Sequence, residues 1–185
     1  MPQTKPIVSI ENVVASATVS QTVNLNLITQ IFPDVEYHPD QFPGLVFRLK
    51  SPKTATLIFS SGKMVCTGAK SEDQAIKAVK NVVQKLKKGG ISIEHEPIIE
   101  IQNIVASADL GTVLNLNAIA IGLGLENIEY EPEQFPGLVY RLSSPKVVML
   151  LFGSGKLVVM GGKRPEDAEA AVEKIVEELD GLGLL

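Results

Sequence analysis

The sequence has few of the residues that build disulfides, metal centres or membrane spans. Its 185 residues include one cysteine and no tryptophan. The single Cys66 excludes an intramolecular disulfide and suits a reducing compartment. There is no run of about 18 apolar residues, so we expect no membrane span, and the N-terminus lacks the apolar stretch of a secretory signal. We therefore expect a soluble, cytoplasmic protein that has no membrane partner.

Signatures of catalysis are also missing. His38 and His95 stand in unrelated contexts and have no cysteine cluster beside them, so no zinc site is predicted. The two Ser-Gly-Lys triplets, 61–63 and 154–156, lack the upstream glycine of a phosphate-binding loop. We expect no metal, no cofactor and no catalytic residue, and we interpret Cys66 as a packing residue. A small hydrolase or transferase stays open as a rival hypothesis, although no acid–base or nucleophile pair recurs in the sequence.

Charge is distributed unevenly along the chain. The formal net charge is −4 and the isoelectric point is near 5.3, which argues against a generic nucleic-acid binder. Residues 1–93 carry 11 basic and 6 acidic side chains, whereas residues 94–185 carry 6 basic and 15 acidic ones. Such a difference between halves suggests that each half meets a different partner.

The same halves contain an internal repeat. Residues 10–16 recur at 101–107 after 91 positions, and residues 41–46 recur at 134–139 after 93 positions. Two residues are therefore added in the second copy, and we place them in a loop around Gly122. Two copies indicate a duplication, with residues 1–93 as the first repeat and residues 94–185 as the second.

Each copy predicts a strand, a short helix, several antiparallel strands and a long helix. In the first copy, strands are expected at 7–16, 45–50, 54–60 and 63–69, with a short helix at 24–32 that Pro33 ends.

The long helices have start signals and an apolar stripe. Ser71 followed by Gln74 forms a capping box, and the helix is expected to stop before Gly89. Its second-copy counterpart begins at Pro165. The residues expected to face inward are Ile76, Val79, Val83 and Leu86, and Ala168, Val172, Ile175 and Leu179. The predicted class is α+β, with the helices on one face of an antiparallel sheet.

The predicted strands are apolar on both faces, although helices can cover only one. Ala55, Leu57 and Phe59 share a face because side chains alternate along a strand, and Thr56 and Ile58 share the other. An uncovered apolar face usually marks an interaction surface. A homodimer interface or a sheet sandwiched between helices stays open. The uncovered face also carries basic residues that a dry core disfavours: Arg48, Lys50, Lys63, Arg141 and Lys156.

Several of these segments resemble the TATA-box-binding protein family. The resemblance is carried by residues 134–142, 144–146, 150–152 and 154–156, and by their first-copy counterparts around Phe42, Arg48, 52–54, 58–65 and 67–73. It covers about residues 7–180, and the lack of a long N-terminal extension is typical of archaeal members. The resemblance implies a saddle of ten antiparallel strands from two pseudo-symmetric halves, with four helices on its convex face and DNA beneath its concave face.

The resemblance also implies a binding site on double-stranded, A·T-rich DNA. Two phenylalanine pairs would intercalate at the ends of the site: Phe42 with Phe59, and Phe135 with Phe152. The minor-groove floor would be read by Asn12, Val14, Leu57, Val65, Thr67, Asn103, Val105, Leu150 and Val158. Phosphates would be contacted by Arg48, Ser61, Lys63, Arg141, Ser154 and Lys156. Met160 occupies the place that corresponds to Thr67 and cannot donate a hydrogen bond, so we do not expect the two halves to bond equally.

Further partners follow from the same resemblance. Glu131 and Glu133 match the loop where a transcription factor B-type protein docks, and RNA polymerase would be recruited indirectly. The function implied is that of a general transcription initiation factor that kinks its TATA box. A homodimer of the free protein, or a protein-binding scaffold that uses the same sheet face, stays open.

Overall fold

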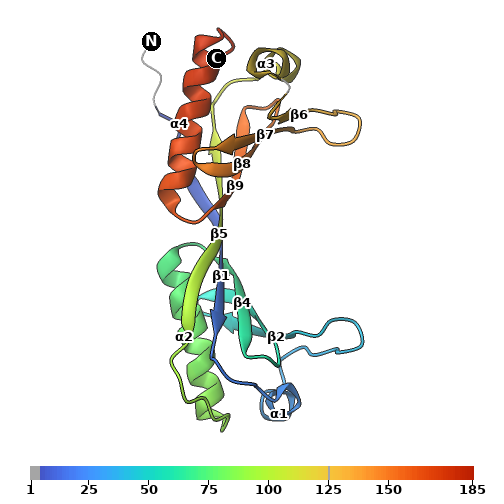
Figure 1. The fold of residues 1–185 in the computed structure, drawn as a ribbon, viewed down its shortest axis with the longest axis vertical. Helices are drawn as coiled ribbons and strands as arrows, with labels where there is room; N and C mark the ends of the chain where they lie inside the picture. The colour runs from blue at the N-terminus through green and yellow to red at the C-terminus, as the bar shows by residue number, and fades with distance from the viewer. Residues whose placement is uncertain (1–4, 125) are drawn as a thin grey trace. The chain divides into compact units, whose positions relative to one another are not determined.

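The computed structural model describes residues 5–124 and 126–185, in which the two repeats have the same order of elements apart from one additional strand, β6, in the second (Figure 1). The first repeat comprises β1 (Ser9–Thr18), α1 (Leu25–Ile31), β2 (Leu45–Lys50), β3 (Lys53–Ile58), β4 (Lys63–Ala69) and α2 (Glu72–Lys88). The second comprises β5 (Ile98–Asp109), α3 (Leu116–Leu123), β6 (Ile128–Glu129), β7 (Leu138–Ser143), β8 (Lys146–Leu151), β9 (Lys156–Gly162) and α4 (Pro165–Gly181).

The chain divides into two compact units that do not coincide with the repeat boundary. One unit is residues 12–102, and the other is residues 103–185 together with the described N-terminal residues up to Glu11. Val8 and Ile10, which begin the first repeat in the sequence, pack against the core of the second unit. Each repeat thus contributes a short piece of strand to the unit formed mainly by the other.

In each unit consecutive strands form an antiparallel meander, and the strand that opens the repeat pairs with the last strand of that meander. In the first unit the strands lie in the order β2-β3-β4-β1, and in the second in the order β6-β7-β8-β9-β5. A register shift interrupts the β1–β4 ladder between Val13 and Ala15, and an equivalent shift interrupts the β5–β9 ladder between Ile104 and Ala106. The sequence-predicted strands are all present.

The described residues form nine strands rather than the ten implied by the resemblance. The difference lies at the outer edge of the first sheet. In the second repeat, Ile128 and Glu129 pair with β7 as the two-residue strand β6. In the first repeat, only Glu36 pairs with β2, through an isolated bridge to Val46. The tenth strand is therefore reduced to a single pair of residues.

The short helices begin at equivalent asparagines. The Asn24 side chain accepts a hydrogen bond from Leu27 N, and the Asn115 side chain accepts one from Ala118 N, each at 3.1 Å. These bonds satisfy an amide at the helix start that has no partner within the helix. The loop predicted around Gly122 is wrong in part, because α3 continues through Leu123 before Gly124 ends it.

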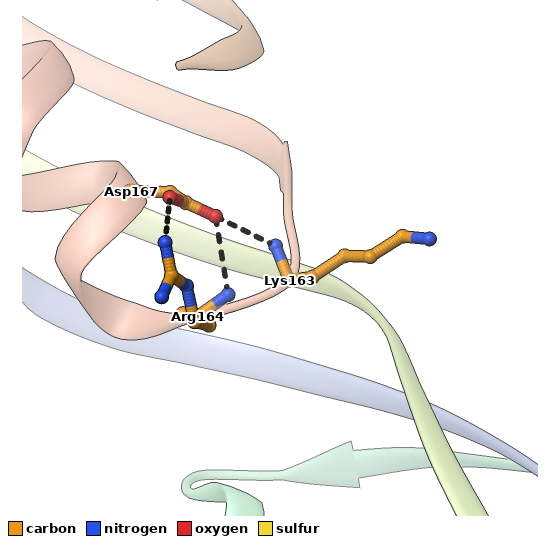
Figure 2. Close-up of polar contacts among 3 residues, drawn as sticks. All are labelled: Lys163, Arg164 and Asp167. Atoms are coloured by element: carbon orange, nitrogen blue, oxygen red, sulfur yellow. Dashed lines mark hydrogen bonds and ion pairs between the residues drawn. The ribbon is translucent and has the colours of Figure 1, made fainter. Parts of the chain in front are cut away.

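The long helices begin by different means. Ser71 caps α2 as predicted, since its hydroxyl accepts from Gln74 N at 3.1 Å, but the side-chain Oε1 of Gln74 accepts from Lys70 N. Figure 2 shows the α4 start, where the Asp167 carboxylate accepts from the backbone amides of Lys163 and Arg164. The Arg164 guanidinium adds an ion pair to Asp167 at 3.8 Å. A carboxylate at this end is favourable because it meets the positive end of the helix dipole.

One face of each sheet is buried beneath the helices. Helix α2 packs against β2, β3 and β4, and α4 packs against β8 and β9. The buried strand residues alternate, as in Thr56, Ile58, Met64 and Cys66. The predicted α+β class, with two repeats and helices on one sheet face, is confirmed. All predicted inward positions of the long helices are buried except Ile76, which is half-buried because Ala75 points more directly at the sheet.

No helix among residues 5–124 and 126–185 is long and apolar enough to cross a membrane.

Candidate functional site

The helix-free face of each sheet is apolar and partly exposed, as strand parity predicts. In the first unit Leu57 and Val65 are half-buried between fully buried neighbours, and Phe59 is half-buried between buried Ile58 and exposed Ser60. In the second unit Leu150 and Val158 are likewise half-buried between fully buried neighbours. The remaining floor residues predicted from the sequence are also half-buried: Asn12, Val14, Thr67, Asn103 and Val105. None of these side chains lies under a helix, because the residues that the helices cover are those of opposite parity.

Each face ends in a pair of phenylalanines with nearly identical geometry. The ring centroids of Phe42 and Phe59 are 5.9 Å apart at 73°, and those of Phe135 and Phe152 are 6.0 Å apart at 72°. Edge-to-face contacts of this kind are favourable. Phe42 and Phe135 remain 43% and 42% exposed. Two large apolar rings are therefore held ready on each sheet, with one ring of each pair open to solvent.

A glycine beneath each pair makes the ring arrangement possible. A Cβ on Gly44 would lie 2.7 Å from Phe42 Cε1 and 3.1 Å from Phe59 Cε1. A Cβ on Gly137 would lie 2.8 Å from Phe135 Cε1 and 3.0 Å from the Phe152 ring. The glycine of the repeated Phe-Pro-Gly motif is thus required by the two rings that close over it. The repeated motif can be recognised in the sequence, but the reason for its glycine depends on how the two rings pack in the fold.

Asn12 is held by hydrogen bonds to two residues of β4, Gly68 and Thr67. Its Oδ1 accepts from Gly68 N at 2.7 Å, and its Nδ2 donates to Thr67 Oγ1 at 3.1 Å. The first bond satisfies an amide where the β1–β4 register shifts. It also sets the orientation of the Asn12 carboxamide, so that the Nδ2 group is the one that donates hydrogen bonds on the other side.

Asn103 is held by one of these two bonds. Its Oδ1 accepts from Gly161 N at 2.7 Å, which repeats the Asn12–Gly68 contact. Met160 stands in the place of Thr67 and has no hydroxyl to accept from the Asn103 amide. The Asn12–Thr67 bond therefore has no equivalent at Asn103, and unequal hydrogen bonding of the two halves to DNA stays a prediction.

Each face contains an open hollow beside its phenylalanine pair. In the first unit the hollow has a volume of about 580 Å³, and its lining brings together Phe59, Ser61, Lys63 and Val65. In the second unit the hollow has a volume of about 610 Å³, and its lining brings together Phe152, Ser154, Lys156 and Val158. The predicted aromatic, hydroxyl, cationic and floor residues therefore converge in both halves.

The hollows are also lined by residues that the sequence did not predict as part of the site. Ser16, Thr18 and Glu100 line the first, and Ser107 and Asp109 line the second. Ser16 and Thr18 share parity with Val14, so strand alternation could have identified them. Glu100 and Asp109 place negative charge on a face that otherwise carries lysines, and no motif pointed to them.

The predicted phosphate-binding arginines form ion pairs along the sheet edge. Arg48 lies 2.7 Å from Glu36 Oε1, and Arg141 lies 3.5 Å from Glu129 Oε1. All four side chains are more than half exposed, so these pairs contribute little to stability. Their effect is to hold each guanidinium at the rim of the apolar face. The sequence pattern did not predict either acidic partner.

Glu131 and Glu133 are exposed in the loop that leads to Phe135. Gln134 N and Phe135 N both donate to Glu131 O, at 2.9 and 3.0 Å. Gln41 N and Phe42 N make the matching bonds to His38 O in the first repeat. The two loops thus share a backbone arrangement and differ in the charge that they present.

The remaining polar groups offer little for catalysis. Cys66 is buried on the helix-covered face, and this burial raises the pKa of its thiol. A thiol with a raised pKa is a poor nucleophile, and the interpretation of Cys66 as a packing residue is confirmed. Within residues 5–124 and 126–185 there is no cluster of three or more His, Cys, Asp or Glu side chains arranged to hold a metal ion.

Comparison with known proteins gives consistent matches over the whole described fold. The family model described as "Transcription factor TFIID (or TATA-binding protein, TBP)" matches residues 7–89 and 98–182. A TATA-box-binding protein of Archaeoglobus fulgidus is 65% identical over 178 residues, which is 96% of this chain and 97% of that protein. TATA-box-binding protein E of Halobacterium salinarum is 60% identical over 185 residues and covers all of both chains.

A solved structure is similar as well. The structure described as Methanococcus jannaschii TBP superposes with a TM-score of 0.84 at 51% identity, and the match covers 95% of this chain and 99% of that one.

Proposed function

The chain belongs to the TATA-box-binding protein family, and from this premise we propose that it binds the minor groove of A·T-rich DNA with the helix-free faces of its sheets and kinks the duplex. Members of this family are DNA-binding transcription factors rather than enzymes, and this chain is a general transcription factor of that kind. The observation that carries the proposal is the apolar, helix-free face in each half, which ends in a matched pair of phenylalanine rings.

The phenylalanine pairs supply the wedge. Minor-groove wedging and bending are known behaviour of this family and serve as a premise here. Unstacking a base step costs a few kcal/mol, and burying an aromatic side chain returns about 1.5–3 kcal/mol. Because each half presents two rings, one of them already about 40% exposed, the burial at each end offsets much of the unstacking cost. Flexible pyrimidine–purine steps lower the remaining cost and should be preferred.

The floor residues supply selectivity for A·T pairs. The minor-groove edges of A·T and T·A offer only acceptors, whereas a G·C pair adds the guanine amino group. Asn12 and Asn103 have their carboxamide oxygens engaged by Gly68 N and Gly161 N, so each presents its nitrogen as a donor. Around them, Val14, Leu57, Val65, Val105, Leu150 and Val158 form an apolar floor.

Cationic and hydroxyl groups supply the phosphate contacts. Lys63 with Ser61 and Lys156 with Ser154 border the two hollows and are exposed. Arg48 and Arg141 stand at the sheet edges and share their charge with Glu36 and Glu129. Backbone contacts of this kind position a protein on DNA without reading its sequence, and their contribution falls as salt rises.

A second protein would then fix the direction of the complex. We assign the docking of a transcription factor B-type protein to Glu131 and Glu133, which are exposed beside the intercalating Phe135. The acidic excess of residues 94–185 favours a basic partner there. Recruitment of RNA polymerase follows through that partner. Without DNA, the exposed apolar faces favour self-association, so a homodimer competes with DNA for the same surface.

A bending assay tests the DNA-binding proposal. Fluorophores at the two ends of an A·T-rich duplex report a shorter end-to-end distance when the protein binds. Phe59→Ala and Phe152→Ala should each reduce the bend, because each removes one ring of a pair. A protein-binding scaffold would give no change in end-to-end distance and no response to either substitution.

A ternary-binding assay tests the partner assignment. Glu131→Lys combined with Glu133→Lys should abolish assembly with a transcription factor B-type protein and leave binary DNA bending largely unchanged. The matched control is Asp40→Lys in the corresponding loop of the first repeat. The assignment is wrong if the double variant still forms the ternary complex.

A further inference from the structure

The two helix-free faces differ at one cross-strand pair. In the first half, Thr67 on β4 lies opposite Ala55 on β3. In the second half, Met160 on β9 lies opposite Val148 on β8. All four side chains are half-buried on the helix-free face. Both members of the pair are therefore larger and more apolar in the second half than in the first.

The hydrogen-bonding capacity of the two pairs also differs. Thr67 Oγ1 accepts one hydrogen bond from Asn12 Nδ2. A hydroxyl has two acceptor lone pairs and one donor, so the bond to Asn12 leaves Thr67 able to accept once more. The Met160 thioether is at most a weak acceptor, and Val148 has no polar side-chain atom.

A guanine amino group distinguishes these surfaces. It is the one donor that a G·C pair adds to the minor-groove floor, and a donor buried without an acceptor loses the full value of its hydration. Over Ala55 and Thr67 the amino group meets an acceptor and a small neighbour. Over Val148 and Met160 it meets two bulkier apolar side chains.

We propose that the two halves read their half-sites with different stringency. The Ala55–Thr67 pair admits a G·C base pair, whereas the Val148–Met160 pair restricts the second half to A·T base pairs. A single G·C pair in an otherwise symmetric A·T site then selects the orientation in which the first half covers it. This inference rests on the proposed minor-groove binding. It adds an orientation signal that lies in the protein–DNA contact itself and needs no partner protein.

An orientation assay tests this inference. Asp40 is exposed in the loop that leads to Phe42, so Asp40→Cys can carry an iron chelate that cleaves nearby DNA, while native Cys66 is buried. On a perfectly symmetric A·T duplex, symmetry requires equal cleavage of the two half-sites, which calibrates the assay. With one G·C pair in one half-site, the expected bias toward the first half covering that pair is about tenfold, within the range typical of one mismatched base pair.

Substitutions at the two cross-strand pairs test whether these residues cause the orientation bias. Met160→Thr combined with Val148→Ala should bring the ratio close to one. Thr67→Val should do the same by removing the acceptor, and Thr67→Ser should keep the bias. The inference is overturned if the labelled protein with its native cross-strand pairs cleaves both half-sites of the G·C-containing duplex equally. It is also overturned if the orientation bias survives in the Met160→Thr, Val148→Ala protein.

The symmetric duplex separates this inference from the proposed function. If that duplex is bound and bent but the G·C pair gives no orientation bias, only the difference in stringency is wrong. If the symmetric duplex is neither bound nor bent, the proposed minor-groove binding is wrong and the inference fails with it.

Discussion

The two halves hold their phenylalanine pairs in the same geometry, whereas the packing on the helix side differs between them. The phenylalanine pairs agree within 0.1 Å in centroid distance, at 5.9 and 6.0 Å. On the helix side, Ile31 and Phe32 fill the space above Gly89 in the first half, whereas Leu182 fills the space beside Gly122 in the second. Gly89 corresponds to Leu182 in the other repeat, and Ile31 corresponds to Gly122, so the large and the small residue of the contact have exchanged places. A duplicated fold can therefore keep a binding geometry while its supporting packing diverges.

Another exchange supports the same lesson. Phe47 and Tyr140 occupy equivalent positions on β2 and β7. Phe47 makes an edge contact with Phe32, with ring centroids 5.2 Å apart, whereas the Tyr140 hydroxyl donates to Glu178 on α4 at 3.0 Å. The first contact ties β2 to the end of α1 by apolar packing, and the second ties β7 to α4 by a hydrogen bond.

The largest expected effect is a loss of stability that should be equal in the two halves. Gly62 and Gly155 have φ of +91° and +95°, and a Cβ would lie 2.1 Å from Gln21 O and 2.2 Å from Thr112 O. Both backbones must shift, so Gly62→Ala and Gly155→Ala should each lower the free energy of unfolding by about 3 kcal/mol or more. Urea denaturation measures this. A difference of more than about 1 kcal/mol between the two would contradict the equivalence of the two turns.

The next effect concerns DNA binding. Gly44→Ala and Gly137→Ala remove no ring atom, but each would push a Cβ into the ring pair above it. Tilted rings should weaken binding to an A·T-rich duplex by about tenfold and reduce the bend, because the wedge is no longer preorganised. Thermal stability should change little, since Phe42 and Phe135 are already 43% and 42% exposed.

The control for this experiment is Gly181→Ala, where a Cβ would meet no atom within 4 Å. It should bind as the parent protein does. An unchanged bend in Gly44→Ala or in Gly137→Ala would show that the ring geometry of that half is not part of the wedge.

A smaller effect should differ between the halves. A Cβ on Gly89 would lie 2.7 Å from Phe32 Cζ and 3.0 Å from Ile31 Cγ2, whereas a Cβ on Gly122 would meet Leu182 Cδ1 at 2.8 Å. The Phe32 ring is a rigid obstacle, but Leu182 is 43% exposed and can turn away. Gly89→Ala should therefore cost about 1–2 kcal/mol of unfolding free energy.

Gly122→Ala should be nearly neutral or slightly stabilising, because alanine is favoured over glycine within a helix. Equal losses in the two variants, measured by denaturant titration, would mean that the packing exchange between halves has no energetic consequence.

The smallest effect is the pH dependence that Tyr140 gives to the stability of the second half. Burial, together with the hydrogen bond and the charge of Glu178, raises the pKa of Tyr140 to about 12. The neutral phenol is thus favoured in the folded state, and its stabilisation is present below pH 10 and is lost as pH rises toward about 12. Tyr140→Phe should lower stability by about 0.5–1.5 kcal/mol at neutral pH. It should also flatten the decline in melting temperature above pH 10, and an unaltered decline would contradict the assignment.

Much of the fold could be predicted from the sequence because its signals are local and occur twice. The strands follow from alternation, Ser71 and Pro165 mark the helix starts, and Phe59 and Phe152 were assigned to the helix-free face by parity. Ile76 was misassigned because a 3.6-residue period leaves two adjacent positions that compete for the buried face. The tenth strand was overcounted because a single bridge at Glu36 depends on how the edge of the sheet pairs.

Contacts between residues distant in the sequence were the least predictable part of the site. The ion pairs Arg48–Glu36 and Arg141–Glu129 depend on the edge register of the sheets. The Asn12–Gly68 bond depends on a register shift that has no sequence signature of its own. The role of Gly44 beneath two rings required both rings to be placed. The fold thus converts a repeated list of residues into two preorganised surfaces.

The most direct test of that central claim replaces A·T pairs in the bound site with inosine·cytosine pairs. An inosine·cytosine pair presents the minor groove of A·T and the major groove of G·C. If the helix-free faces read the minor-groove floor, affinity and bend should stay within about threefold of the A·T duplex, and a G·C duplex should lose both. An inosine·cytosine duplex that binds as poorly as the G·C duplex would show that this protein does not read DNA through the minor groove.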